Sequence, residues 1–379
     1  MDLLLQIVTY GVPFLIVLTV LVFVHELGHY WVARRNGVRI EVFSIGFGSE
    51  LFGWTDKAGT RWKFSAVPLG GYVKMYGDAD ATSAPGEALP DMTPEQRAVS
   101  FHHKRVGQRA AVVAAGPAAN FLFAIVVFAA LYVFKGQPFT PPEVGSVLPG
   151  SAAEAAGIQP GDRIVRIDGE AIERFEDILR IVQLNLDTGP LAIVVQRDGR
   201  EVALEATPAI VTNTDNFGRE WRGPLLGLRA GRVELRQYGP IEAIQRAAQE
   251  TWNQTIGTLR AMGQIVSGRR SSAELGGPGR IAEMAGEVTR SGGVIALIVF
   301  MCVLSINLGL INLFPVPMLD GGHLLFYAAE VLRGRPLSLR TQEYGFRIGL
   351  VLVLSLMLFA TWNDLVHWRV VQFFVNLVS

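Results

Sequence analysis

Four long apolar segments limit what this chain can fold into. They run from about residue 3 to 33, 110 to 134, 292 to 313 and 348 to 368. A helix needs about 20 predominantly apolar residues to cross a bilayer, and each segment meets this length. Half of the 379 residues are hydrophobic and the formal net charge is zero. The sequence therefore predicts a polytopic α-helical membrane protein with four transmembrane helices, and it offers no basic excess for binding nucleic acid.

A charged motif lies near the end of the first apolar segment, where His25-Glu26-Leu27-Gly28-His29 follows an apolar run. Two histidines four residues apart share one face of a helix, so both can bind a single divalent ion. Glu26 points off that face, but its side chain is long enough to reach a water beside the metal, as in zinc peptidases. Ionisable groups inside a membrane helix are costly and mark functional interiors, which favours a metal site over a chance match.

A second candidate site follows the third apolar segment. Pro315 and Pro317 must break the helix there, and broken backbone at membrane depth persists only where it lines protein or a water-filled cavity. Asp320 comes next and, considered alone, could cap a helix that begins at Gly321. Beside a histidine pair that lacks a third ligand, Asp320 is instead predicted to complete a catalytic zinc site, which uses three protein ligands.

Arg61–Met75 is predicted to form two short β segments around a Pro68-Leu69-Gly70-Gly71 turn. Such a membrane-associated β-hairpin could offer an open edge to an extended substrate, or it could lie at the interface without a catalytic role. The pattern alone favours neither.

Residues 141–208 are predicted to form an inserted α+β domain in which Asp168-Gly169 and Asp198-Gly199 are hairpin turns. Its stretch GSVLPGSAAEAAGIQPGDRIVRIDGEAI resembles a PDZ domain, and this resemblance implies that the domain binds a peptide by strand addition or acts as a passive spacer or lid. Residues 209–290 are expected to hold an irregular stretch, 211–234, and an amphipathic helix at the outer membrane interface. The remaining boundaries are 1–140 and 291–379 for the two membrane halves.

Basic residues lie in the two short connections between apolar segments, at Arg34, Arg35, Arg39, Lys104, Arg105, Arg109, Arg333, Arg335, Arg340 and Arg347. The positive-inside rule places both connections in the cytoplasm and the α+β domain and both termini outside. The histidine motif then lies toward the cytoplasmic half of the membrane. Adjacent His102 and His103 face different ways, so we interpret them as part of a basic surface and not as metal ligands.

Five stretches together resemble the bacterial site-2 intramembrane zinc metalloproteases of the RseP type. They are VHELGHYWVARRNGVRIEVFSIGFG, PLGGYVKMYG, VGQRAAVVAAGPAANF, INLGLINLFPVPMLDGGHLLF, and GSVLPGSAAEAAGIQPGDRIVRIDGEAI, which resembles a PDZ domain. The resemblance covers nearly the whole chain. It implies that His25, His29 and Asp320 bind one Zn²⁺ ion, that Glu26 is the catalytic base, and that Asn312 contacts substrate.

The resemblance further implies a membrane-inserted β element and a substrate-binding surface. The residues expected on that surface are Asn312, Gly70, Gly71, Tyr72, Val73, Pro315 and Pro317. His323 lies three residues beyond Asp320, and it is expected either in the second shell of the metal or as a replacement ligand. The enterobacterial members carry two PDZ domains, whereas this sequence shows one.

The implied function is hydrolysis of peptide bonds in or near the transmembrane segment of single-pass membrane proteins in the bacterial inner membrane. An anti-sigma factor already cut by an upstream site-1 protease is the expected substrate, and remnant signal peptides are a second class. Two other readings compete. A membrane-anchored zinc peptidase acting on soluble proteins would place its motif on a cytoplasmic helix and use a glutamate as third ligand. A non-catalytic PDZ scaffold would lack Glu26 or Asp320, and both are present.

Overall fold

The computed structural model describes residues 7–78, 92–185, 189–214, 220–268, 272 and 276–367. The chain divides into two compact units. The first, here called the membrane unit, comprises Met1–Ala130 and Ile241–Ser379, and the second, the α+β unit, comprises Leu131–Pro240. The helices that lie wholly or largely in the membrane unit are η1 (Ile7–Gly11, a π-helical turn), α2 (Val12–Arg35), α3 (Pro94–Val99), α4 (Val106–Phe134), α7 (Pro240–Val266), α8 (Pro278–Asn312), α9 (Asp320–Arg333) and α10 (Leu339–His367).

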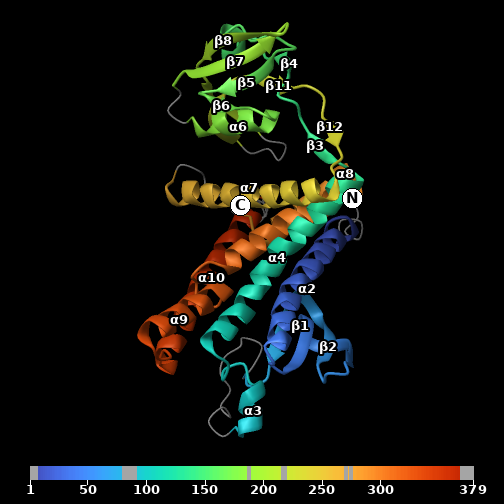
Figure 1. The fold of residues 1–379 in the computed structure, drawn as a ribbon, viewed down its shortest axis with the longest axis vertical. Coiled ribbons are helices and arrows are strands. Elements are labelled where there is room, and N and C mark those ends of the chain that lie inside the picture. The colour runs from blue at the N-terminus through green and yellow to red at the C-terminus, as the bar shows by residue number, and fades with distance from the viewer. Residues whose placement is uncertain are drawn as a thin grey trace, which may run out of the picture. The chain divides into compact units, whose positions relative to one another are not determined.

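Each predicted apolar segment largely coincides with a long helix of the described chain. By length and composition the helices that can cross a membrane are Val8–Arg35, Val106–Phe134, Pro278–Asn312 and Arg340–Val366. They lie alongside one another, and α7 crosses their ends (Figure 1). The third helix begins well before the predicted residue 292, and its backbone is interrupted at Gly293, where φ is 66°. Residues 3–6 and 368 of the predicted spans lie outside the described residues.

The amphipathic helix predicted within residues 209–290 is α7. It buries Ala243, Ala247 and Thr251 at every fourth position. Large apolar side chains such as Ile241 and Trp252 are 76% and 65% exposed. A helix that packs through small residues and presents large apolar ones outward is suited to a membrane interface.

The β segment of the membrane unit differs from the prediction. Arg61–Met75 is not a self-paired hairpin, because it forms one strand, β2, that pairs with β1 (Ile40–Thr55). Phe43 pairs both with Trp62 and with Val73, so the two halves of β2 flank the first half of β1 on opposite sides. β1 can bend back onto Trp62 because Gly46 and Gly48 have φ of 89° and 84°. Residues 71–75 consequently form an edge of this small sheet.

Asp364, the charged residue near the end of the fourth apolar segment, caps the third helix. Its carboxylate is buried and accepts hydrogen bonds from the backbone N–H groups of Gly277, Gly279 and Arg280, at 2.8, 3.1 and 3.3 Å. These N–H groups are among those that a helix start leaves without an intrahelical acceptor. A carboxylate at this position also interacts favourably with the helix dipole. The cap accounts for an ionisable side chain in an apolar segment.

We predict that Asp364→Ala lowers the free energy of unfolding by about 2 kcal/mol, because three backbone donors lose their acceptor. Asp364→Asn keeps one acceptor oxygen and should lose less. Denaturant unfolding of the detergent-solubilised protein measures both. Equal stability of Asp364→Ala and the wild type would show that the cap contributes nothing.

The α+β unit is built around an antiparallel sheet in the order β6-β5-β7-β8. Its core includes Ile164, Ile167, Ile178, Ile193 and Val195, which are almost fully buried. The Asp-Gly turns are confirmed, since Asp168 and Asp198 both have φ of 49° between paired strands. The elements are β3 (Gln137–Phe139), β4 (Val144–Val147), α5 (Ala152–Ala155), β5 (Arg163–Ile167), β6 (Glu170–Ala171), α6 (Phe175–Leu184), β7 (Leu191–Arg197), β8 (Arg200–Ala206), β9 (Ala209–Thr214), β10 (Glu220–Leu225), β11 (Leu228–Ala230) and β12 (Glu234–Arg236).

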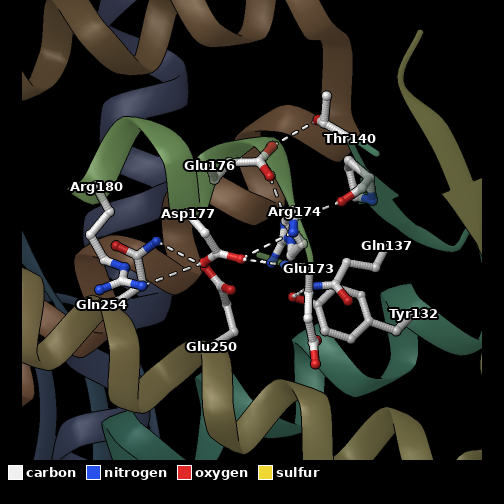
Figure 2. Close-up of polar contacts among 11 residues, drawn as sticks. Tyr132, Gln137, Thr140, Glu173, Arg174, Glu176, Asp177, Arg180, Glu250 and Gln254 are labelled. Carbon is white, nitrogen blue, oxygen red and sulfur yellow. Dashed lines mark hydrogen bonds and ion pairs between the residues drawn. The ribbon is translucent and has the colours of Figure 1, made fainter. Parts of the chain in front are cut away.

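The start of α6 is fixed by polar contacts within the α+β unit (Figure 2). Thr140 Oγ1 donates to Glu176 Oε1 at 2.7 Å, and Asp177 Oδ2 accepts from the backbone N–H of Arg174 at 3.0 Å. Two carboxylates in the first turn complement the positive end of the helix dipole.

The stretch 211–234, expected to be irregular, contains strands. β9 and β10 pair with each other, while β11 pairs with β4 and β12 pairs with β3. Because β11 completes a pair with a strand about 80 residues earlier, it belongs to the single α+β unit and not to a second copy. These strands are short and their partners are distant in the sequence, so the local pattern of apolar residues did not identify them.

Candidate metal centre

The two motif histidines continue the buried stripe of α2. The helix buries Pro13, Val17, Leu21, His25, His29 and Ala33, each four residues after the last. This spacing keeps them on one face, and because His25 and His29 are consecutive members of the stripe, their imidazoles lie one helical turn apart and meet. The Nε2 atoms of His25 and His29 lie 3.2 Å apart.

Asp320 reaches the same point from the other membrane half. It is the first residue of α9, and Leu319 occupies the N-cap position with no capping side-chain hydrogen bond. The alternative that Asp320 caps this helix is therefore wrong. Its Oδ2 lies 3.2 Å from His25 Nε2, and its Oδ1 lies 3.6 Å from His29 Nε2.

The backbone before Asp320 follows a strained path that close packing supports. Met318 has φ of 93°, which is rare for a residue with a side chain. A Cβ on Gly322 would lie within 2.7 Å of Pro317 N, so only glycine allows α9 to begin against the loop. The loop conformation and the tight helix start together direct Asp320 toward the histidines.

These three side chains fit a zinc ion. Among the residues that the structure describes, their ligand atoms form a cluster in which all lie within 4.8 Å of one another. Two ligand atoms that are each about 2.0–2.1 Å from a tetrahedral ion are about 3.3 Å apart, close to the three separations given above. The buried Oδ2 of Asp320 also has no hydrogen-bond partner in the described chain. A bound cation would satisfy this oxygen and both imidazole lone pairs at once.

Helix α4 supplies groups around the histidines that the sequence analysis did not identify. His29 Nδ1 donates to the Val112 carbonyl at 2.9 Å, which leaves its Nε2 lone pair free for a metal. Asn120 Nδ2 lies 3.1 Å from His25 Nδ1. Gly116 lies between them on the same face, and a Cβ there would be 2.8 Å from His25 Cε1. The signal available in the sequence was an asparagine within an apolar segment, Asn120.

Glu26 lies between α2 and the edge of the β1–β2 sheet. The backbone of Val73 hydrogen-bonds to its carboxylate. A Cβ on Gly71 would be 2.6 Å from the Ser44 carbonyl oxygen and 3.4 Å from Glu26 Cγ, so the strand approaches α2 closely only because this residue is glycine. Glu26 is thus held beside the predicted metal ligands and is not part of their cluster.

A cavity of about 490 Å³ joins these groups. The predicted residues that line it are His25, Glu26, His29, Gly71, Tyr72, Val73, Asn312, Asp320 and His323. Asn312 Nδ2 lies 3.4 Å from His25 Nε2. The predicted base, the predicted metal ligands and one strand edge therefore all line the same cavity.

Among the described residues, Gly70, Pro315 and Pro317 do not line this cavity, whereas His323 lines it without belonging to the ligand cluster. Gly70 packs beneath the ring of Phe47, with φ of 142°. The Pro317 carbonyl faces Gly349 of α10, and Pro315 belongs to the same connection between α8 and α9. His323 stacks obliquely on Phe346, with ring centroids 5.2 Å apart, and it is not in the three-residue ligand cluster.

His102 and His103 lie outside the cluster as well. His102 Nε2 pairs with Asp78 Oδ1 at 2.9 Å, and His103 Nδ1 hydrogen-bonds with Ser100 Oγ at 3.1 Å. Their different partners agree with the expectation that adjacent histidines point in different directions.

Comparisons with known proteins agree on one family. Residues 13–356 match the sequence profile of Peptidase family M50. A protein of Rhizobium meliloti (strain 1021) that carries the name of a zinc metalloprotease is 46% identical over 97% of this chain and 99% of its own length. Metalloprotease MmpA of Caulobacter vibrioides is 41% identical over 97% and 98%. The regulator of sigma E protease of Salmonella typhi is 33% identical over 93% and 97%.

Among solved structures, the PDZ domain of an SdrC-like protein from Listeria innocua is similar to part of this chain. The match has 18% sequence identity and a TM-score of 0.21, and it covers 25% of this chain and 99% of the PDZ domain.

Proposed function

Because this chain belongs to Peptidase family M50 and is a zinc metalloprotease with helices suited to a membrane, we propose that it cuts peptide bonds within the membrane. The observation that carries the proposal is the position of His25 and His29. They are buried in an apolar helix long enough to span, and their third partner, Asp320, comes from a broken segment after another such helix. We propose that one Zn²⁺ ion binds per chain.

Glu26 is the proposed general base. It would take a proton from the attacking water and return it to the leaving nitrogen, a role that suits a carboxylate held beside the ligands by the Val73 backbone. When bound, the zinc ion would polarise the scissile carbonyl and make the water more acidic. The Asn312 amide is proposed to donate a hydrogen bond to the substrate carbonyl oxygen, and its position 3.4 Å from His25 Nε2 supports this role.

Residues 71–75 are the proposed substrate-binding edge. A transmembrane helix hides its peptide bonds in its own hydrogen bonds, so a substrate must unwind before attack. An edge strand offers backbone donors and acceptors to an extended segment. Gly71, Tyr72 and Val73 line the cavity that holds Glu26, which supports binding of the unwound segment there. The proposed roles of Gly70, Pro315 and Pro317 are to shape this edge and the loop before Asp320.

The proposed substrate is a single-pass membrane protein, with an anti-sigma factor first cut by an upstream protease as the leading case. The support is similarity to a regulator of sigma E protease. We propose that the chain lies in the bacterial inner membrane with the α+β unit and both termini in the periplasm and the site toward the cytoplasmic side. Arg34, Arg35, Arg109 and Arg333 at the ends of helices support this orientation.

The proposal is tested with purified protein in lipid vesicles and a single-pass substrate that carries no large soluble domain. We expect cleavage inside the apolar segment, found by mass spectrometry of the fragments, and its loss when a chelator removes zinc. A soluble unfolded protein is the parallel substrate. Cleavage of the soluble protein alone would instead identify a membrane-anchored peptidase. If the zinc-loaded protein cleaved neither substrate, the result would favour the non-catalytic PDZ scaffold.

A further inference from the structure

Asn120 is a polar side chain with no part in the proposed reaction. It lies in α4 with its side chain fully buried. The side-chain amide lies against the outer nitrogen of His25, with Nδ2 3.1 Å from Nδ1. Its Oδ1 has no hydrogen-bond partner within the described part of the chain. A buried amide that contacts a metal ligand and leaves its oxygen unpaired calls for a physical explanation.

The chemistry of the histidine decides which end of the amide should face it. A neutral imidazole that offers Nε2 to a metal carries its proton on Nδ1, so Nδ1 must donate a hydrogen bond. An amide NH₂ opposite Nδ1–H would set two donors against each other. The two ends of an amide have nearly the same shape, and rotation of the side chain exchanges them without a steric cost. Only the orientation with Oδ1 toward His25 gives Nδ1–H an acceptor.

The arrangement around His29 supports this orientation independently. His29 Nδ1 donates to the Val112 carbonyl, which belongs to the same helix α4. Val112, Gly116 and Asn120 are spaced by four residues and so share one face. Gly116 keeps the centre of that face open, because a Cβ there would be 2.6 Å from His29 Cε1. One face of α4 therefore lies against both imidazoles and offers an acceptor for each.

The position of Asn120 is fixed from its other side by α8. Ser305 Oγ donates to the backbone carbonyl of Asn120 at 2.9 Å. A Cβ on Gly309 would lie 3.2 Å from the Asn120 Cβ, so glycine allows the two helices to meet there. The amide is thus held between α2 and α8 with little freedom to move away from His25.

We propose that Asn120 is a positioning residue whose side-chain carbonyl accepts the His25 Nδ1 hydrogen and thereby directs His25 Nε2 toward the zinc ion. This inference rests on the zinc site of the proposed function. Removing an outer partner of a metal-bound histidine typically weakens metal binding by about 10- to 100-fold. The same loss is expected here, although Asn120 itself does not touch the metal.

The test compares zinc affinity, measured by competition with a chelator, in Asn120→Asp, Asn120→Leu and Asn120→Ala. Aspartate keeps an acceptor and should bind zinc as tightly as the wild type or more tightly. Leucine, of similar size, and alanine, which adds no volume, should each weaken binding by about 10- to 100-fold. Asn307→Leu is the matched control, because the Asn307 side chain in α8 accepts a hydrogen bond from Thr258 and is not among the described residues that line the cavity. Its zinc affinity should not change.

The outcomes separate this inference from the proposed function. If the wild type binds no zinc, the metal site itself is wrong. If the wild type binds zinc and the alanine and leucine variants bind it equally well, only the role of Asn120 is overturned. A loss in Asn120→Asp as large as that in Asn120→Leu would also overturn it, because the amide NH₂ would then be the required group. Thermal unfolding of each variant identifies any that fail to fold.

Discussion

Replacing Glu26 with glutamine is expected to lower the rate of peptide cleavage by about 10²- to 10⁴-fold while zinc stays bound. Glutamine has nearly the same shape and can still contact the Val73 backbone, but it cannot accept the proton of the attacking water. Zinc binding should persist because Glu26 is not one of the three clustered ligands. Cleavage of a single-pass substrate and the zinc content of the same preparation give the two readouts.

The control for this variant is Glu343→Gln, which makes the same change at an exposed position where Glu343 pairs with Arg347 of the same helix. It should cleave as fast as the wild type. Near-normal cleavage by Glu26→Gln would remove Glu26 from the mechanism, and loss of zinc from this variant would show that it acts as a ligand.

Asp320→Asn is expected to weaken zinc binding by more than about 100-fold and to abolish cleavage. The substitution keeps the size of the side chain but replaces an anionic oxygen ligand by a neutral amide, beside two neutral imidazoles. The effect should exceed that of Asn120→Leu. Asp320 contacts the predicted metal-binding atom of His25, Nε2, whereas Asn120 contacts the other ring nitrogen, Nδ1. Chelator competition measures the zinc affinity of both variants.

Asp198→Asn serves as the control for Asp320→Asn. Asp198 lies at a turn in the α+β unit with φ of 49°, a conformation that asparagine also adopts readily. Zinc affinity and cleavage should match the wild type. If Asp320→Asn bound zinc normally, the third ligand would have to be another group, and His323 of the same cavity would be examined first.

The cluster of His25, His29 and Asp320 could be predicted from the sequence, because each of the three residues follows a local rule. His25 and His29 are one helical turn apart, and Asp320 follows a pair of prolines that must break a helix. Ionisable side chains are rare in apolar segments because burying a charge in the membrane is costly, so those that occur there are easily recognised. Asp364 follows this rule too, but its role is structural, and only the hydrogen bonds to the start of α8 distinguish a cap from a ligand.

What the sequence did not reveal depends on contacts between distant segments. Asn120 and the Val112 carbonyl reach the histidines only because α4 crosses α2 at Gly28 and Gly116. The prediction of a self-paired hairpin at Arg61–Met75 was wrong because β1 pairs with both halves of β2. Bends at glycines in β1 make this pairing possible. Strand pairing depends on the partner strand, and the alternation of residues within one segment does not identify that partner.

The central claim is that His25, His29 and Asp320 together hold one zinc ion. X-ray absorption at the zinc edge, with metal content per chain, tests it most directly on the purified wild-type protein. The account predicts one zinc per chain with two imidazole nitrogens and oxygen ligands at about 2.0–2.2 Å. A third imidazole, a sulfur ligand at about 2.3 Å, or a correctly folded protein that does not take up zinc would contradict it.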